Sequence, residues 1–225
     1  ELKLQGNKKK IKKEWRDKII YHPISGFPNN VNTAWEREYY LRNELNNRVP
    51  ATDSDIVIIA DTDEIINLSS IRKHFPLNSP MLIELPTFYH FLNLKSTEVI
   101  NVTLITPYRY IKNINIGNRN KYKELTNSFL EVSNKNGAHL TYMFGYDLKK
   151  YIEKIQSFSH QEFNQKYYLN SGRIKACLKY NIDLFDRKEY QYFEIDLSKE
   201  LPDFYEVIEK SRQLKDLLKK RTLHT

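Results

Sequence analysis

The stretch Asp55-Ile-Val-Ile-Ile-Ala-Asp61-Thr-Asp63-Glu64 decides the fold that this sequence predicts, because an apolar run ends abruptly in three carboxylates. Apolar residues between polar flanks predict a strand buried on both faces, as in the parallel sheets of α/β domains. Asp61 and Asp63 would then stand at its carboxyl end, where such sheets bind ligands. Two carboxylates on one turn can hold a divalent cation against a diphosphate, which favours transfer from a phosphorylated donor. The other interpretation is an acidic turn that caps the next element.

The composition indicates one large α/β domain, or a domain with a small appendage, in 225 residues. A net charge of +8 favours anionic partners such as nucleotides, phosphorylated glycans, nucleic acid or an acidic membrane, without choosing among them. Cys177 is the single cysteine, which excludes an intrachain disulfide and favours a reducing, cytoplasmic compartment. We expect neither a transmembrane helix nor a signal peptide, and peripheral membrane contact only through the basic ends.

The first half of the chain alternates strand and helix signals. Residues 15–22 are typical of a short strand, followed by a loop. Thr33 and Glu36 have the spacing of a capping box, which predicts a helix to about Asn47. The apolar face of that helix would consist of Trp35, Tyr39, Leu41 and Leu45.

After the central strand, we expect a short helix over 68–74 and strands over 81–94, with Pro86 at a break or an edge. Residues 95–135 are assigned to strands and loops.

The second half contains more helix. Asp147 can cap a helix to about Gln156, and Asn170 or Ser171 can cap another that contains Ile174, Cys177 and Leu178. A last helix begins after Pro202, with a buried stripe of Phe204, Val207, Ile208, Ser211, Leu214 and Leu218. We therefore expect a single domain over residues 1–225, with an α/β core over 1–200 and a basic C-terminal helix over 201–225.

Four segments, in their order and spacing, resemble glycosyltransferase family 17. They are Asn32-Thr-Ala-Trp-Glu-Arg-Glu-Tyr-Tyr-Leu-Arg-Asn43, Asp55 to Glu64, Gly137-Ala-His139 and Ile155-Gln-Ser-Phe-Ser-His-Gln-Glu-Phe-Asn164. The resemblance implies a GT-A-like, Rossmann-type mixed sheet flanked by helices. It also implies that a sugar is transferred, with inversion, from a UDP-sugar to a glycan acceptor. The implied donor is UDP-N-acetylglucosamine, and the implied divalent cation is manganese or magnesium. Nucleic acid is not an expected partner.

The chemistry of that reaction suggests roles for the acids. A cation held by Asp61 and Asp63 would stabilise the charge that develops on the leaving diphosphate. Inversion also needs a base that accepts the acceptor hydroxyl proton. Glu162 and Glu64 are the candidates, with a slight preference for Glu162, because Glu64 can instead brace the acidic turn.

Other side chains in the family-like segments have two interpretations each. His139 and His160 can each ligate the metal, contact the diphosphate or fill hydrogen-bonded core positions, and His160 is the preferred metal ligand of the two. Arg37 can contact donor phosphates or form a structural ion pair. Trp35 is more typical of core than of a sugar platform. The aromatic residues from Phe88 to Phe91 can line an acceptor groove or belong to a half-buried strand.

Two departures from the family pattern bear on activity. A strand-helix unit that relatives carry before the stretch similar to residues 5–9 has no counterpart here, so the α/β core is expected to be N-terminally incomplete. Ala138 stands where relatives commonly have Trp, which removes a large surface for stacking or packing.

Two other functional classes stay open. A strand that ends in Asp-x-Asp also occurs in metal-dependent phosphohydrolases of the haloacid dehalogenase type and in nucleases, although Ile65 stands where the former usually have Thr or Val. The third class is a noncatalytic module that binds glycans or nucleic acid through a basic surface.

Overall fold

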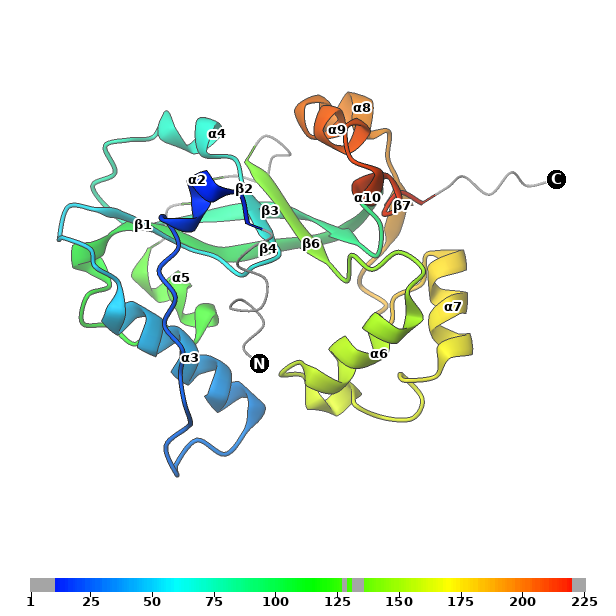
Figure 1. The fold of residues 1–225 in the computed structure, drawn as a ribbon, viewed down its shortest axis with the longest axis horizontal. Helices are drawn as coiled ribbons and strands as arrows, with labels where there is room; N and C mark the ends of the chain where they lie inside the picture. Colours follow the sequence, from blue (N-terminus) through cyan, green and yellow to red (C-terminus); the bar gives the residue numbers. More distant parts are fainter. Residues whose placement is uncertain (1–10, 127–128, 131–135, 220–225) are drawn as a thin grey trace.

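A computed structural model describes residues 11–126, the backbone of residues 129–130, and residues 136–219. Its centre is a mixed sheet in the order β1-β4-β3-β6-β2, with β5 beside β3 and β7 beside β4 (Figure 1). β3 runs parallel to β5 and β6, and the other pairs are antiparallel. The strands are β1 (Ile56–Ile59), β2 (Glu64–Ile66), β3 (Met81–Tyr89), β4 (Leu94–Pro107), β5 (Phe129–Leu130), β6 (Gly137–Thr141) and β7 (Tyr192–Glu194).

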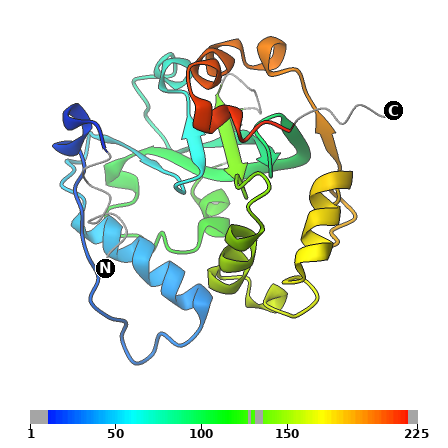
Figure 2. The same ribbon diagram turned by 45° about the vertical axis from the view of Figure 1, so that its right-hand side comes forward.

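Helices cover both faces of this sheet, which confirms the predicted α/β class (Figures 1 and 2). On one side lie α3 (Ala34–Arg48), α5 (Tyr122–Leu125), α6 (Leu148–Ser157) and α7 (Ser171–Tyr180). On the other lie α4 (Leu68–Arg72), α8 (Leu197–Glu200) and α9 (Pro202–Glu209). The remaining short helices are α2 (Lys13–Arg16), α10 (Arg212–Lys215), η2 (Tyr108–Tyr110), η3 (Arg119–Lys121) and η4 (Gln161–Phe163). No helix of the described ranges is both long and apolar enough to span a bilayer.

The prediction that residues 56–60 form a fully buried strand of a parallel sheet is wrong. β1 lies at the end of the strand order, pairs antiparallel with β4 and is half-buried along its length. β3 is the central, nearly fully buried strand. Both strands need apolar residues, so an apolar run in the sequence does not distinguish an edge strand from a central strand. As expected, Pro86 marks a break, because the β3 and β4 register shifts between Pro86 and Phe88.

Local capping signals were predicted well. Thr33 accepts from the backbone N–H of Glu36, and the Glu36 carboxylate accepts from the backbone of Thr33, so the capping box starts α3 as expected. Asp147 caps α6 and Asn170 caps α7. The predicted strand over 15–22 is wrong, because residues 13–16 form α2 and residues 17–22 have no regular structure. Here the local bonds from Trp15 and Lys18 close turns instead of a ladder.

The apolar face predicted for α3 is largely exposed. Trp35, Leu41 and Leu45 are more than a third exposed, whereas the polar Asn46 is buried. Its side-chain amide donates to the carbonyl of Ile111 at 2.9 Å and thereby ties α3 to the segment after η2. A satisfied amide thus anchors the helix where apolar contacts were expected.

The C-terminal helix expected over 201–225 is interrupted. α9 ends at Glu209, and the Ser211 side chain accepts from the N–H of Leu214 to cap α10, so Ser211 is a cap and not part of a buried stripe. Ile208 is fully buried, but Val207 is exposed. Lys219 is also buried, at 5% exposure, with its ammonium 3.6 Å from Glu194. Residues 220–225, including part of the predicted basic tail, lie outside the described residues.

Gly137 is required where β6 pairs with β2. Its φ is 138°, and an added Cβ would stand 2.0 Å from the carbonyl oxygen of Ile65. We expect Gly137→Ala to destabilise the protein by more than about 1 kcal/mol in chemical denaturation, because the backbone must move. Gly26→Ala is the control, since nothing lies within 4 Å of its Cβ position. Equal unfolding midpoints for the two variants would contradict this account.

Candidate functional site

The predicted acidic stretch forms a turn between β1 and β2, at residues 60–63. The N–H of Glu64 donates to the Asp61 carbonyl at 3.0 Å, and the N–H of Asp61 donates to the Glu64 carboxylate at 3.2 Å. These reciprocal hydrogen bonds fix the turn. The acidic residues therefore have a structural role at the start of β2. The three carboxylates have different surroundings.

Asp61 is held by two arginines. Arg119 approaches its Oδ2 at 2.5 Å, and Arg42 Nη2 lies 3.1 Å from Oδ1 and 3.2 Å from Oδ2. Burial alone raises the pKa of Asp61, but the guanidinium groups of Arg119 and Arg42 outweigh it and lower that pKa below its usual value. The carboxylate is therefore ionised and already neutralised by cations.

Glu64 is a fully buried carboxylate in an ion pair. Arg119 Nη2 donates to both of its oxygens, at 2.6 and 2.9 Å, and the Thr103 hydroxyl donates to Oε2 at 2.7 Å. A carboxylate with its lone pairs so engaged has little capacity to accept a proton from a bound hydroxyl. The geometry thus favours the bracing role for Glu64 over the role of base.

Asp63 and His139 lie side by side on neighbouring strands. Asp63 precedes β2, its backbone carbonyl accepts from the N–H of Leu140 at 2.7 Å, and its Oδ2 lies 3.9 Å from His139 Nε2. The Asp63 side chain is 37% exposed. Within the described part of the chain, the buried Nδ1 of His139 has no hydrogen-bond partner. The Asp61 side chain is similarly exposed, at 40%, so the two aspartates differ in their partners and not in exposure. Among the described residues, Asp63 has no arginine partner, and it is therefore the aspartate of the turn whose charge is left for a ligand.

These residues fit a divalent cation only in part. Within the described ranges, no three His, Cys, Asp or Glu side chains gather closely enough to hold a metal, so the predicted set of Asp61, Asp63 and His160 is not brought into one cluster. Asp63, with His139 Nε2 beside it, can still offer an oxygen to a cation. Mg²⁺ in particular takes few protein ligands and completes its shell with water and substrate phosphates. The arrangement suits such a cation, and it does not suit one held by protein alone.

The segment from Ser157 to Asn164 folds against the start of α3. His160 Nδ1 lies 2.7 Å from Glu162 Oε1, and both side chains are about half exposed. The His160 ring meets Trp35 edge-on with centroids 4.7 Å apart. Trp35 is therefore a half-exposed partner of His160 instead of a core residue. The hydrogen bond between His160 and Glu162 lowers the pKa of the Glu162 carboxyl below its usual value, so this carboxylate is ionised.

A chain of polar contacts links that segment to the acidic turn. The Ser159 hydroxyl donates to Glu38 on α3, and Arg42 Nη2 lies 2.6 Å from the other oxygen of Glu38. The same Nη2 atom contacts Asp61. One guanidinium nitrogen therefore joins the carboxylates of Glu38 and Asp61, and it fixes the position of α3 relative to the turn. Sequence reasoning matched Arg42 to the family segment but missed Glu38 and Arg119, because no local pattern predicts either contact.

An open groove of about 660 Å³ lies between α3 and residues 154–161, and we call it the α3 groove. Arg37 lines it, with Nη1 donating to the carbonyl of Asn32 at 3.0 Å. The suggestion that residues from Phe88 to Phe91 line an acceptor groove is wrong, because Phe88, Tyr89 and Phe91 are at most 1% exposed. Their strand is central to the sheet, not half-buried.

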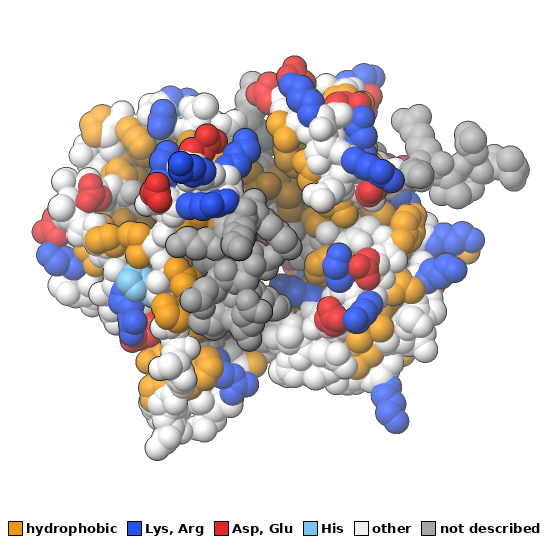
Figure 3. Space-filling model, viewed as in Figure 1, with side chains coloured by type: hydrophobic (Ala, Val, Ile, Leu, Met, Phe, Trp, Pro, Cys, Tyr) orange, Lys and Arg blue, Asp and Glu red, His pale blue; other side chains and the backbone are white. Residues whose placement is uncertain are grey.

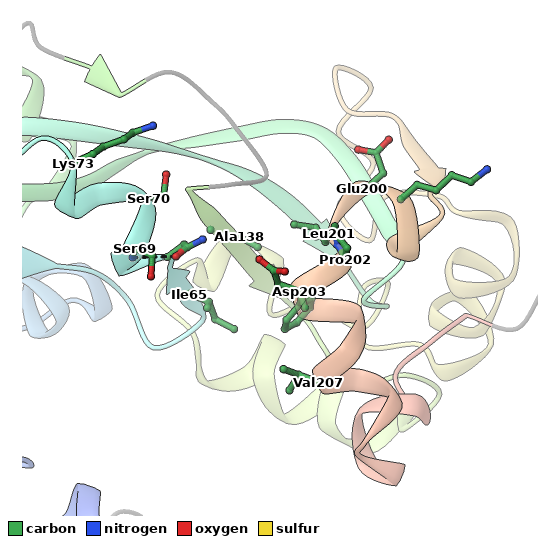
Figure 4. Close-up of a pocket in the computed structure, with 14 residues that line it drawn as sticks. Ile65, Ser69, Ser70, Lys73, Ala138, Glu200, Leu201, Pro202, Asp203 and Val207 are labelled. Atoms are coloured by element: carbon green, nitrogen blue, oxygen red, sulfur yellow. Dashed lines mark hydrogen bonds between the residues drawn. The ribbon is translucent and has the colours of Figure 1, made fainter.

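A second hollow, of about 830 Å³, lies on the opposite side of β2 and β6, between α4 and the C-terminal helices (Figure 4). Residues alternate across a strand, so Ile65 and Ala138 point into this hollow while their neighbours Glu64 and His139 face the other way. Ala138 is buried and packs with Leu197 and Ile208. The hollow therefore does not contain the predicted acids.

Charged side chains of both signs are spread over the surface in Figure 3, where Lys and Arg gather beside Asp and Glu around α2. In this region Lys12, Lys13 and Lys18 are exposed, and so is Glu14. On this face the excess positive charge does not form one uninterrupted basic patch.

Comparison with protein families identifies the class to which this chain belongs. The sequence profile of glycosyltransferase family 17 matches residues 1–213, so the chain belongs to that family. No curated protein and no solved structure matches the chain. The family and the mixed α/β fold together support a transferase that acts on sugars.

Proposed function

We propose that this protein transfers N-acetylglucosamine from UDP-N-acetylglucosamine to a hydroxyl of a glycan, with inversion at the anomeric carbon and with the help of manganese or magnesium. The observation that carries the proposal is the unequal pair of aspartates. Their side chains are similarly exposed, but Asp61 is neutralised by Arg42 and Arg119, whereas Asp63 has only His139 beside it among the described residues, in a chain of glycosyltransferase family 17.

In this proposal, Asp63 and His139 would face the donor diphosphate. A divalent cation bound there would supply positive charge against the leaving diphosphate. Asp61 fixes the turn through its ion pairs with two arginines, and Glu64 fixes it through its ion pair with Arg119. The site is thus built from one carboxylate without an arginine partner, Asp63, on a rigid support of charge-paired side chains.

The proposed base is Glu162. As the acceptor oxygen bonds to the anomeric carbon, the bond to the diphosphate oxygen breaks and the hydroxyl proton passes to a carboxylate. Glu162 is ionised and exposed, and His160 orients it through the 2.7 Å contact. Glu64 is the weaker candidate because its oxygens are occupied by Arg119 and Thr103.

We expect Asp63→Asn to lower turnover of UDP-N-acetylglucosamine on the order of a hundredfold or more while the melting temperature stays unchanged, because the lost charge acts on the leaving group. Release of UDP with added manganese, together with calorimetric affinity for manganese and UDP, measures this. Asp61→Asn is expected to lower the melting temperature as well, since Arg42 and Arg119 lose their shared partner.

Asp53→Asn is the matched control for that experiment. Asp53 forms an exposed ion pair with Lys112 at 2.9 Å, away from the acidic turn, so both donor turnover and stability should stay near those of the wild type. An Asp63→Asn variant that binds manganese and UDP as tightly as the Asp53→Asn control would refute the role of Asp63.

A further inference from the structure

The α3 groove combines apolar faces with planar polar groups. Phe27, Leu41 and Phe158 contribute carbon surface, and Arg37, Glu38 and Gln161 contribute hydrogen-bonding groups. Phe27 packs edge-on against Tyr40 with ring centroids 5.9 Å apart, and 43% of it stays exposed. A large aromatic side chain held in place but left open to solvent is a ready stacking surface.

This mixture suits carbohydrate. A sugar ring presents C–H groups on its faces and hydroxyl groups around its edge, so it needs an apolar platform bordered by donors and acceptors. The groove volume of about 660 Å³ lies in the range of sites that bind small ligands. A groove lined by carbon surface together with guanidinium and amide groups meets both needs.

The start of α3 is not an open phosphate site. The N-terminus of α3 is closed by its capping box, with Glu36 accepting from the backbone N–H groups of Asn32 and Thr33 at 2.9 and 2.8 Å. Those N–H groups are not free to bind a phosphate, and the carboxylate at this end repels an anion. The groove wall itself carries one carboxylate, Glu38, whose oxygens bond Ser159 and Arg42, and two cationic side chains, Arg37 and Lys154.

The groove is also connected to the acidic turn. Glu38, which lines it, accepts from Ser159 and pairs with Arg42, and Arg42 pairs with Asp61. Gln161, another lining residue, lies between His160 and Glu162 in the chain. A ligand in the groove would thus contact the segment that carries the proposed base, and the chain of ion pairs joins one wall of the groove to the acidic turn.

We propose that the α3 groove binds the glycan acceptor, with a sugar ring stacked on Phe27 and its hydroxyls bonded to Arg37 and to the second lone pair of Gln161 Oε1. The Gln161 amide nitrogen already donates to the carbonyls of Gln156 and Phe158, and Oε1 accepts one bond from Asn164. This inference rests on the proposed function for the identity of the ligand as acceptor, but the binding of a neutral oligosaccharide can be measured without any transfer. Glu38 then holds two walls of the groove together, since it lies on α3 and accepts from Ser159 on the facing segment.

The test is direct binding of neutral disaccharides, cellobiose, mannobiose and N,N′-diacetylchitobiose, to the full chain by ligand-observed NMR. We expect saturable binding of at least one of them, weakened about tenfold in Phe27→Ala, the loss expected for one aromatic contact, and weakened also in Gln161→Ala. Phe75→Ala is the control, because Phe75 is 38% exposed and lies outside the groove. UDP binding is measured on the same variants.

Three results would overturn the inference. They are equal disaccharide affinities for Phe27→Ala and Phe75→Ala, no saturable binding of any disaccharide, and a Phe27→Ala variant that loses UDP affinity instead. Because UDP release from the donor is assayed separately, failure of the groove is distinguishable from failure of the proposed function. Disaccharide binding that depends on Phe27, in a protein that does not consume UDP-N-acetylglucosamine, would support the groove and refute the transferase proposal.

Discussion

Replacing Arg119 with Met is expected to destabilise the protein by about 3–5 kcal/mol, the cost of breaking a buried ion pair from one side. Arg119 is 8% exposed and contacts Asp61 at 2.5 Å and Glu64 at 2.6 Å, while Nε donates to the carbonyl of Val102. Its loss leaves the fully buried carboxylate of Glu64 without a counter-charge. Urea denaturation at neutral pH measures the free energy of unfolding.

Arg109→Met is the matched control. Arg109 is exposed, stacks 5.0 Å from the Tyr110 ring and donates to the carbonyl of Asn78, so its replacement should cost less than about 1 kcal/mol. Adding Glu64→Gln to Arg119→Met should recover part of the lost stability, because the uncompensated charge disappears. If Arg119→Met were no worse than Arg109→Met, the ion pair would not support the acidic turn.

The second large effect is a fall in stability as the pH drops, caused by His90. Burial lowers the pKa of His90 from 6.5 to about 3; nearby Asp183 opposes that shift, and Lys219 and Arg187 add to it. Within the described residues, neither ring nitrogen of His90 has a hydrogen-bond partner. The unfolded chain thus gains a proton below pH 6.5 that the folded protein excludes until about pH 3.

The sign of this effect follows from the proton count. Above pH 6.5 both states carry a neutral His90, so it adds no pH dependence. Below that value the unfolded state binds more protons, and the free energy of unfolding falls by about 1.4 kcal/mol per pH unit. His90→Asn should flatten this slope between about pH 6 and pH 4.5, and Asn suits the positive φ of 68° at this position. Parallel slopes for the variant and the wild type would contradict the assignment.

Local sequence determined several parts of this protein. The caps Thr33, Asp147 and Asn170 start the expected helices, because each cap bonds a backbone N–H within three residues of itself. The acidic turn follows a strand as predicted, and the ordered segments similar to glycosyltransferase family 17 identified the family before any geometry was known. These features depend on contacts near in the chain or on residue order alone.

The tertiary structure decided which of the acids is paired with arginine. Arg119 reaches Asp61 and Glu64 across 58 and 55 residues of chain, so no spacing in the sequence predicts that it neutralises the first aspartate and buries the glutamate. The tertiary structure likewise placed His160 against Trp35. It also placed the Phe88 to Phe91 segment in the core. Edge and central strands are both apolar, so the sequence determined that β1 is a strand, and only its pairing with β4 placed it at the end of the strand order.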